Sequence, residues 1–284
     1  MENVPAPPAA RHVAFVVHPD RREAADLAVQ ARKWWEGRGY AVVDLGENEQ
    51  EDGTAAGPCE FAVSLGGDGT MLRTVQFAVG RGIPVLGVNL GSLGYLAQVE
   101  PGGMETAFGR LVAGDYEIEE RMVLAVRVRR PVGRDVTAIG LNEAGVLKTV
   151  PGRTIRLDVA VAGHPFLSYV VDGIVVATPT GSTGYNLSLR GPIVSPRLRL
   201  LIVTPISPHM LFDRPLVLDP AEVVRIEPRD GPPAVLVVDG SNVVPVGLGE
   251  TVDVSAGGQP ARIVRFEPDR FHAILAAKFG LGTR

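Results

Sequence analysis

Short apolar runs alternate with helical patterns through the first part of the chain. Apolar residues recur at helical spacing in one segment that ends near Trp35, in a second from about Thr70 to Val79, and in a third at 104–113. Runs rich in β-branched residues predict strands around these helices, at residues 13–17, 40–45, 61–65 and 84–88. Strands separated by helices pair in parallel through right-handed crossovers, so this part predicts a doubly wound, Rossmann-like α/β sheet.

The second part of the chain is rich in β-type segments. Short apolar segments broken by Gly, Pro and Asp indicate antiparallel sheets. These segments lie at residues 123–128, 136–141, 155–161, 168–171, 173–177, 200–203, 223–226, 235–238 and 252–254. A helical pattern returns at 271–279, so the C-terminal tail is expected to pack on the first domain. We therefore expect an α/β domain at residues 1–118, joined by the tail 268–284, and a β-rich domain at 119–267.

Composition and charge exclude several classes of protein. Hydrophobic residues make up 45% and charged residues 21% of the 284 residues, as in globular proteins rather than disordered ones. A net charge of −4 gives no electrostatic reason to expect nucleic acid or an anionic membrane as a partner. No apolar run reaches the ~18 residues of a membrane span. Residues 1–11 lack the pattern of a signal peptide, and the single Cys59 suits a reducing compartment, so we expect a cytoplasmic protein.

A strand, a glycine turn and a helix start meet at residues 61–73. The turn reads GGDGT at residues 66–70, and its glycines allow a sharp bend and close approach of a ligand to the backbone. Backbone N–H groups at such a turn and at a helix start suit a phosphate. Asp68 is the one acid in this turn, and bound phosphate would repel it unless it had a chemical role. The same residues also fit an ordinary β-to-α turn whose acid is favoured by the helix dipole.

Polar residues near other strand ends are candidates for ligand contacts. Asn142 and Glu143 follow an apolar run and can bind a ribose or a base edge, or can form a simple strand-end turn. Arg153 lies a few residues later, where a solvated loop charge is the default interpretation. Tyr95 follows the strand at 84–88 and could stack on a base or pack in the core.

A longer polar stretch begins at Asp172. The strand at 173–177 leads into TPTGSTGYNLS at residues 178–188, which combines hydroxyls, glycines and Tyr185. Hydroxyls and backbone amides suit phosphate or ribose, and a tyrosine ring suits an adenine face. A purely structural loop is the alternative.

Together these stretches resemble the NAD kinases, which phosphorylate the 2′-hydroxyl of the adenosine ribose of NAD to give NADP. The resemblance rests on GGDGT at 66–70, on Asn142 with Glu143, and on the run 172–188, and it extends to ISPHMLFDRP at 206–215 and VDG at 238–240. It covers most of the chain. The glycine motif alone also resembles lipid kinases and phosphofructokinases, whereas the combination is specific.

The resemblance implies roles for particular residues. Asp68 looks like the general base, and Tyr95 falls where the family usually has an aromatic residue beside the adenine. The other positions that match ligand-binding residues, some of them across a subunit interface, are Gly69, Arg73, Asn142, Glu143, Arg153, Asp172, Thr183, Gly184, Tyr185, Asn186, Leu187 and Ser188. The departures from the family pattern are Ser92 in place of a basic residue, Gly184 in place of alanine and Ser241 in place of glutamine.

The resemblance also implies substrates and partners. It implies NAD as acceptor, ATP or polyphosphate as donor, Mg²⁺ with the donor, and a homodimer or homotetramer. The charge and the lack of a long apolar run lead us to expect neither nucleic acid nor a membrane as partner. In phosphoryl transfer through a loose transition state, Asp68 would accept the hydroxyl proton late. Two alternatives stay open: a kinase of the same superfamily that acts on a lipid or another substrate, and a nucleotide-binding sensor without catalysis.

Overall fold

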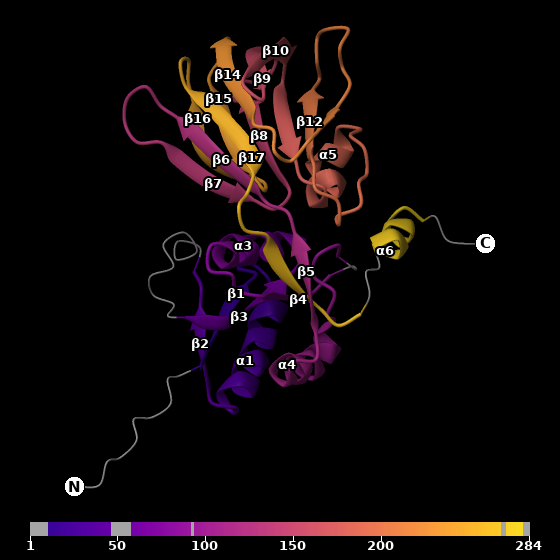
Figure 1. The fold of residues 1–284 in the computed structure, drawn as a ribbon. Coiled ribbons are helices and arrows are strands. Elements are labelled where there is room, and N and C mark those ends of the chain that lie inside the picture. Colours follow the sequence, from indigo (N-terminus) through magenta and orange to yellow (C-terminus); the bar gives the residue numbers. More distant parts are fainter. Residues whose placement is uncertain (1–10, 47–57, 92–93, 268–270, 281–284) are drawn as a thin grey trace. The chain divides into compact units, whose positions relative to one another are not determined.

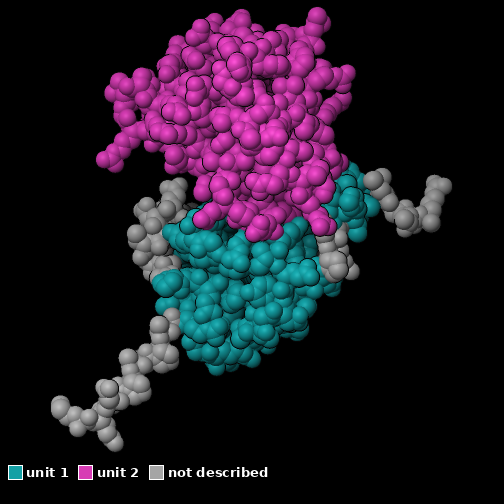
Figure 2. Space-filling model, viewed as in Figure 1, with its two compact units in different colours: residues 1–119, 262–284 teal, residues 120–261 magenta. Residues whose placement is uncertain are grey.

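A computed structural model describes residues 11–46, 58–91, 94–267 and 271–280 (Figure 1). The chain divides into two compact units, unit 1 with Met1–Glu119 and Arg262–Arg284, and unit 2 with Glu120–Ala261 (Figure 2). The chain returns to unit 1 at Arg262, earlier than the expected position 268. Ser92 and most of the expected loop after the second strand lie outside the described residues. No helix in the described ranges combines the length and apolar character needed to cross a membrane.

Unit 1 is built on one six-stranded sheet with the strand order β2-β1-β3-β4-β18-β5. β1 pairs in parallel with β2 and β3, and β4 pairs in parallel with β3 and β18, which confirms the predicted α/β architecture. The elements of the sheet and its helices, in chain order, are β1 (Arg11–Val17), α1 (Arg22–Glu36), β2 (Tyr40–Asp44), β3 (Cys59–Gly66), α3 (Asp68–Val79), β4 (Val85–Asn89), η1 (Pro101–Gly103), α4 (Met104–Ala113), β5 (Glu117–Arg121), β18 (Ala261–Arg265) and α6 (Phe271–Lys278).

Helices cover both faces of this sheet (Figure 1). The chain moves from β1 to β2 in one direction along the sheet and from β3 to β4 in the other, so right-handed crossovers place α1 and α3 on opposite faces. Trp35 of α1 and Phe108 of α4 pack together on one face, with ring centroids 5.1 Å apart. β3 and β4 end at the same edge, because Gly66 is registered with Asn89. Ligands of such sheets bind beyond the carboxyl ends of the strands.

Unit 2 consists of two six-stranded sheets of antiparallel strands, with the orders β10-β9-β14-β17-β6-β7 and β13-β12-β11-β8-β15-β16. The predicted β-rich second half is thereby confirmed. Its elements, in chain order, are β6 (Leu124–Arg129), β7 (Val136–Gly140), β8 (Glu143–Lys148), β9 (Ile155–Val161), β10 (His164–Val171), β11 (Gly173–Ala177), η2 (Thr180–Thr183), α5 (Tyr185–Ser188), β12 (Leu201–Ile206), β13 (Leu216–Leu218), β14 (Val224–Asp230), β15 (Ala234–Val238), β16 (Ser241–Val246) and β17 (Thr251–Ala256).

The two sheets of unit 2 bury one common apolar core. Leu124 and Leu157 contribute from the first sheet, and Ile174 and Leu236 contribute from the second, each at most 1% exposed. Inward-facing residues alternate with polar outward ones along most strands, as in β-sandwiches. The core fixes the two sheets and thereby the positions of the strand ends that carry the candidate site residues.

Sequence analysis did not predict five of the strands, which are β5, β8, β13, β16 and β18. Their apolar residues are few, or are flanked by charges, or are interrupted by Gly and Pro, as in EIEER for β5 and EAGVLK for β8. β8 is nevertheless central, because it pairs with both β11 and β15. Its strand conformation comes from its two neighbours rather than from a local pattern.

Candidate active site

Asp68 lies at the carboxyl edge of the sheet in unit 1, as the first residue of α3 and two residues after β3 ends. Its carboxylate accepts backbone N–H groups from the loop that follows β4. The N–H of Tyr95 donates to Oδ2 at 3.1 Å, and the N–H groups of Leu96 and Ala97 donate to Oδ1 at 3.2 and 3.4 Å. The backbone therefore fixes the orientation of this carboxylate through charge-assisted hydrogen bonds.

The glycines around Asp68 fall into two kinds. A Cβ at Gly94 would clash with Asp68 Oδ1, and one at Gly66 would clash with the first turn of α3, so these two glycines let the loop and the helix start approach each other. A Cβ at Gly67 or Gly69 would meet no atom of the described chain within 4 Å, and neither residue has a left-handed backbone. Gly67 and Gly69 thus present an open face beside Asp68 that a ligand can approach.

A buried ion pair holds the same loop from its other side. Arg265 Nη1 donates to the Leu96 carbonyl at 2.8 Å, and Arg265 Nε pairs with Glu119 at 2.6 Å. The Arg265 side chain is 7% exposed and that of Glu119 is 16% exposed. Removing one member of such a pair leaves the other charge in a poorly hydrated site, so the loop that orients Asp68 depends on both.

Tyr95 is half-buried, and its ring contacts the returning helix α6. The ring centroids of Tyr95 and Phe271 are 6.1 Å apart, and Lys278 Nζ lies 5.0 Å from the Tyr95 centroid. Burial, and after it the charge of Asp68, raises the pKa of the Tyr95 phenol. Arg73 is half-buried on α3, little more than one helical turn after Asp68.

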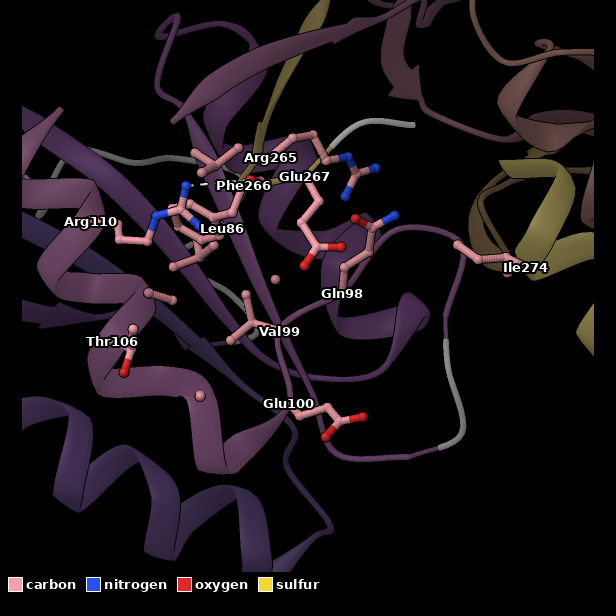
Figure 3. A pocket seen from close by; sticks show the side chains of 14 residues that line it. Leu86, Gln98, Val99, Glu100, Thr106, Arg110, Arg265, Phe266, Glu267 and Ile274 are labelled. Carbon is pink, nitrogen blue, oxygen red and sulfur yellow. Dashed lines mark hydrogen bonds between the residues drawn. The ribbon is translucent and has the colours of Figure 1, made fainter. Parts of the chain in front are cut away.

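A cavity of about 350 Å³ opens in unit 1 beside β4, β18 and α4 (Figure 3). Leu86, Val99 and Phe266 line its apolar side, and the charged side chains of Arg265 and Glu267 also border it. None of the residues predicted from the sequence lines this cavity. We therefore place the candidate active site at the Asp68 turn, where an acid, backbone donors and open glycine faces occur together, and not in this cavity.

In unit 2, Asn142 and Glu143 form the turn that leads into β8. The Asp239 carboxylate accepts the backbone N–H groups of Leu141, Asn142 and Glu143 at 2.7, 2.8 and 3.1 Å. From the other side, the Thr178 N–H donates to the Asn142 carbonyl at 2.9 Å, and Thr178 Oγ1 donates to the Leu141 carbonyl at 2.6 Å. The turn is thus held by its backbone, which leaves the side chains of Asn142 and Glu143 for other contacts.

Those two side chains lie beside the start of α5. A Cβ at Gly184 would stand 2.8 Å from Glu143 Oε2 and 3.5 Å from Asn142 Nδ2. Burial, and after it the charge of Asp239, raises the pKa of Glu143 to about 7, while the backbone N–H of Tyr185 acts in the opposite direction. Glu143 Oε2 has no hydrogen-bond partner among the described residues. Glu143 can therefore change charge near neutral pH and, when ionised, can accept a ligand hydroxyl.

The hydroxyl-rich run after β11 folds into η2 and α5 and uses several of its hydroxyls internally. Ser182 Oγ donates to the Val194 carbonyl at 3.1 Å, and Thr183 Oγ1 donates to the Thr180 carbonyl at 3.2 Å. The hydroxyls of Ser182 and Thr183, which suggested phosphate or ribose binding, therefore stabilise this turn. Tyr185, by contrast, is 40% exposed and is available to a ligand.

Asn186, another residue predicted to contact the ligand, has a side chain that is held within unit 2. Its side chain is 0% exposed; Oδ1 accepts the Thr204 hydroxyl at 2.7 Å, and Nδ2 donates to the Pro192 carbonyl at 3.2 Å. A buried amide with these bonds anchors α5. On the same helix Leu187 is half-buried and Ser188 is exposed.

Asp172 and Arg153 lie away from the turn at Asn142 and Glu143. β8 starts at Glu143 and ends at Lys148, whose Nζ pairs with Asp172 at 2.5 Å. A strand of this length spans roughly 17 Å. Arg153 is exposed in the connection that follows the same end of β8. Within one chain, therefore, these two predicted ligand contacts are not brought together with Glu143.

Four residues that shape the site were not named as candidates from the sequence: Asp239, Thr178, Arg265 and Glu119. The sequence offered a signal for two of them, because Thr178 belongs to the hydroxyl-rich run at 178–188 and Asp239 to VDG at 238–240. Arg265 and Glu119 act on partners that are distant along the chain, as with Arg265 and Leu96, which are 169 positions apart. No local pattern reports such a contact.

Two family profiles match the chain. The ATP-NAD kinase N-terminal domain matches residues 53–116, and the ATP-NAD kinase C-terminal domain matches residues 141–266. The chain is 42% identical over 224 residues to NAD kinase 2 of Streptomyces avermitilis, which covers 78% of this chain and 74% of the relative. It is 37% identical over 293 residues to the NAD kinase of Leifsonia xyli subsp. xyli, with 96% and 95% of the two chains covered.

Solved structures have the same fold. The crystal structure of yeast NADH kinase complexed with NADH has a TM-score of 0.85 at 22% identity, with 97% of this chain and 89% of that chain covered. The NAD kinase from Archaeoglobus fulgidus in complex with ATP has a TM-score of 0.74 at 26% identity, with 96% and 100% covered. The family profiles and the relatives confirm the resemblance seen in the sequence: the chain is an enzyme of the NAD kinase family.

Proposed function

We propose that this chain transfers the γ-phosphoryl group of ATP to the 2′-hydroxyl of the adenosine ribose of NAD and so makes NADP. The observation that carries the proposal is Asp68, an acid at the glycine turn that is oriented by three backbone N–H groups and flanked by open glycine faces. Membership of the NAD kinase family supports NAD as the acceptor rather than a lipid. A relative of the same fold solved in complex with ATP supports the donor.

Asp68 acts as the general base. An ionised carboxylate offers about four acceptor positions, and among the described residues the loop N–H groups use three of them. A position therefore remains for the ribose hydroxyl. As the ribose oxygen bonds to the γ-phosphorus and the bond from that phosphorus to the bridging oxygen breaks, the hydroxyl proton passes to Asp68 and ADP leaves. Such base assistance contributes ~10² to 10⁴-fold to the rate.

The glycine turn binds the phosphates of the donor. Gly67 and Gly69 expose backbone at the start of α3, where the first N–H groups of a helix lack intrahelical acceptors and the helix dipole favours an anion. Arg73 on the same helix adds a positive charge. Asp68 lies between these glycines, so its fixed orientation keeps the carboxylate on the acceptor hydroxyl rather than on the phosphates.

The turn at Asn142 and Glu143 binds the adenylyl half of NAD, together with Thr183, Gly184 and Tyr185. The Asn142 amide offers both donors and acceptors, the Glu143 carboxylate accepts ribose hydroxyls, and the exposed Tyr185 ring stacks on the base. We also propose the half-buried Leu187, the exposed Ser188 and Tyr95 as contacts to NAD. Asp172 and Arg153 contact a ligand bound by a neighbouring subunit, which accommodates their distance from Glu143 within one chain.

Mg²⁺ enters with ATP as part of the donor. No three His, Cys, Asp or Glu side chains cluster as metal ligands anywhere in the part of the chain that the structure describes. This fits an ion that keeps several waters and binds through substrate phosphates with one or two carboxylates. The ion would neutralise the charge of the donor phosphates.

Assembly and location complete the proposal. The enzyme forms a homodimer or homotetramer, because Asp172 and Arg153 require a neighbour to act. The cysteine Cys59 is buried and free, which suits the reducing cytoplasm. Light scattering of the purified chain measures its mass in solution and so tests whether it is a dimer or a tetramer.

The test of the proposed function is NADP formation by the purified chain. NAD, ATP and Mg²⁺ are supplied, and NADP is detected with an NADP-specific dehydrogenase. Parallel reactions replace ATP with polyphosphate and NAD with NADH. Formation of NADP with ATP is the expected result, whereas NAD binding without NADP formation would support a sensor instead.

A further inference from the structure

Asp239 is a turn residue whose carboxylate points back to the start of β8. It follows β15, and its carboxylate accepts the N–H groups of Leu141, Asn142 and Glu143 within 3.1 Å. Its own backbone N–H donates to the Glu143 carbonyl at 3.0 Å. One residue therefore binds Glu143 through both its side chain and its backbone.

Asp239 and Gly240 form the two-residue turn between β15 and β16, and both have a positive φ, +48° and +80°. Positive φ at both central residues with the sequence Asp-Gly is typical of the type I′ turn of a tight hairpin. The turn places the Asp239 carboxylate against the backbone of residues 141–143. Gly140 borders the same space, since a Cβ there would lie 2.9 Å from the Val238 side chain and 3.5 Å from Asp239 Oδ1.

The other side of the turn is closed as well. Thr178 donates to the carbonyls of Leu141 and Asn142, and a Cβ at Gly181 would clash with the Asn142 carbonyl. The backbone of residues 141–143 is therefore clamped between Asp239 and the segment after β11. With the backbone held on both sides, the side chains of Asn142 and Glu143 extend toward Gly184.

Asp239 also acts on Glu143 through its charge. Two carboxylates near each other repel, so the ionised form of Glu143 is disfavoured. Apart from burial, Asp239 is the group that raises the pKa of Glu143, and the Tyr185 N–H from α5 is the group that lowers it. The strands that flank Glu143, β11 and β15, face it with Ala177 and with the segment that ends at Val238.

We propose that Asp239 is a positioning residue for NAD: by clamping the backbone of residues 141–143, it aims Asn142 and Glu143 at the ligand. The inference rests on the proposed function, because it assigns NAD to these side chains. Asp239 itself does not touch the substrate. It differs from a general structural residue in that its loss changes the affinity for NAD and the charge state of one identified carboxylate.

The test compares Asp239→Asn with Asp219→Asn in the full-length enzyme. Asp219 is a matched control, because its carboxylate also accepts a backbone N–H in a turn of unit 2, that of Ala221 at 2.8 Å, but lies in an exposed connection. In D239N an amide NH₂ faces N–H donors, so we expect the KM for NAD to rise roughly tenfold or more. The kcat changes less than the KM, and D219N matches the wild type in both.

The pH profile separates positioning from general loss of structure. Removing the Asp239 charge lowers the pKa of Glu143, so the acid limb of kcat/KM for NAD moves to lower pH in D239N. Glu143→Gln should remove the acid limb of kcat/KM for NAD. Adding Asp239→Asn to that variant should therefore leave its pH profile unchanged. A KM within ~2-fold of the wild type, or an acid limb that stays in place, overturns the proposal.

A measurement on the wild-type protein tests the proposal even if D239N folds poorly. Hydrogen–deuterium exchange of the wild-type peptide that contains residues 141–143 reports the clamp directly, and we expect protection as strong as that of β8. Exchange as fast as in exposed turns overturns the clamp. If the wild type makes no NADP but the peptide is protected, the proposed function fails and the clamp stands, so the two failures are distinguishable.

Discussion

Asp68 and Arg265 bind the same residue from its two sides: Asp68 Oδ1 accepts the Leu96 N–H at 3.2 Å, and Arg265 Nη1 donates to the Leu96 carbonyl at 2.8 Å. The proposed base is therefore oriented by a peptide that is itself fixed by a buried ion pair. Such an arrangement keeps a carboxylate in place without using a second side chain next to the substrate. It makes the catalytic rate sensitive to residues that do not touch the ligand.

Replacing the base tests its role most directly. Asp68→Asn keeps the size of the side chain and removes its ability to accept a proton, so NADP formation should fall by ~10² to 10⁴-fold, while the KM for NAD stays close to the wild-type value. The measurement is steady-state kinetics with the dehydrogenase-coupled assay. Asp26→Asn on the exposed face of α1 is the control, and near wild-type turnover in D68N would refute the assignment.

Gly94→Ala tests the close approach of the loop to Asp68. The new Cβ would clash with Asp68 Oδ1, so the loop must move and the backbone donors to the carboxylate are displaced. We expect kcat to fall and the free energy of unfolding to drop by about 1 to 3 kcal/mol. Gly109→Ala in α4 is the matched control, since its Cβ meets nothing within 4 Å and should stabilise the protein by ~0.4 to 1 kcal/mol. Equal behaviour of the two variants in urea unfolding and in turnover would contradict the geometry.

Arg265→Met tests whether the ion pair supports the base. The change leaves Glu119 without the guanidinium in a largely buried site, and breaking such a pair costs about 3 kcal/mol of stability. The kcat should fall more than the KM for NAD rises, because the loop at residues 95–97 acts on Asp68. Arg11→Met is the control. Arg11 binds Glu60 at the same 2.6 Å but with side chains 50% and 36% exposed, so it should lose at most ~1 kcal/mol. If the kcat of R265M is unchanged in folded protein, the loop does not depend on this residue.

The raised pKa of Glu143 predicts an effect of pH on catalysis and another on stability. Its pKa is about 7 in the folded protein, so lowering the pH through 7 protonates the carboxylate and weakens its acceptance of ribose hydroxyls. The kcat/KM for NAD should fall on the acid side with a midpoint near this pKa, and Glu143→Gln should abolish that limb. A midpoint unchanged in E143Q would assign the limb to another group.

The same pKa predicts that Glu143 destabilises the fold at high pH. Its folded-state pKa lies above the ordinary 4.5, so the native state binds more protons than the unfolded state between these values, and stability falls as the pH rises from 4.5 to 7. The loss approaches about 3 kcal/mol above pH 7. E143Q should therefore be more stable than the wild type at pH 8 and no more stable at pH 4.5, as measured by urea unfolding. Equal stability at pH 8 would contradict this burial of charge.

Much of the fold follows from local patterns. Apolar runs and helical spacing predicted β3, α3, β4 and α4 close to their observed bounds, because each of these elements buries either a continuous apolar run or one apolar face. The pattern failed for β5, β8, β13, β16 and β18, whose conformation depends on the strands beside them. The pattern also does not reveal that the Asn186 side chain is held by Thr204 and Pro192, since an amide in a polar run has the same composition whether it binds a ligand or stabilises a turn.

The sequence by itself determined the alternation of strands and helices in the first part, the β-rich character of the second part, the acid at the glycine turn, and the family. The tertiary structure decided what orients the acidic residues: Asp68 by a loop 27 to 29 positions away, Leu96 by Arg265, and the turn at Asn142 and Glu143 by Asp239. The physical reason is that secondary structure and motifs depend on neighbours along the chain. The direction, burial and charge of a carboxylate depend instead on groups that only folding brings within hydrogen-bond distance.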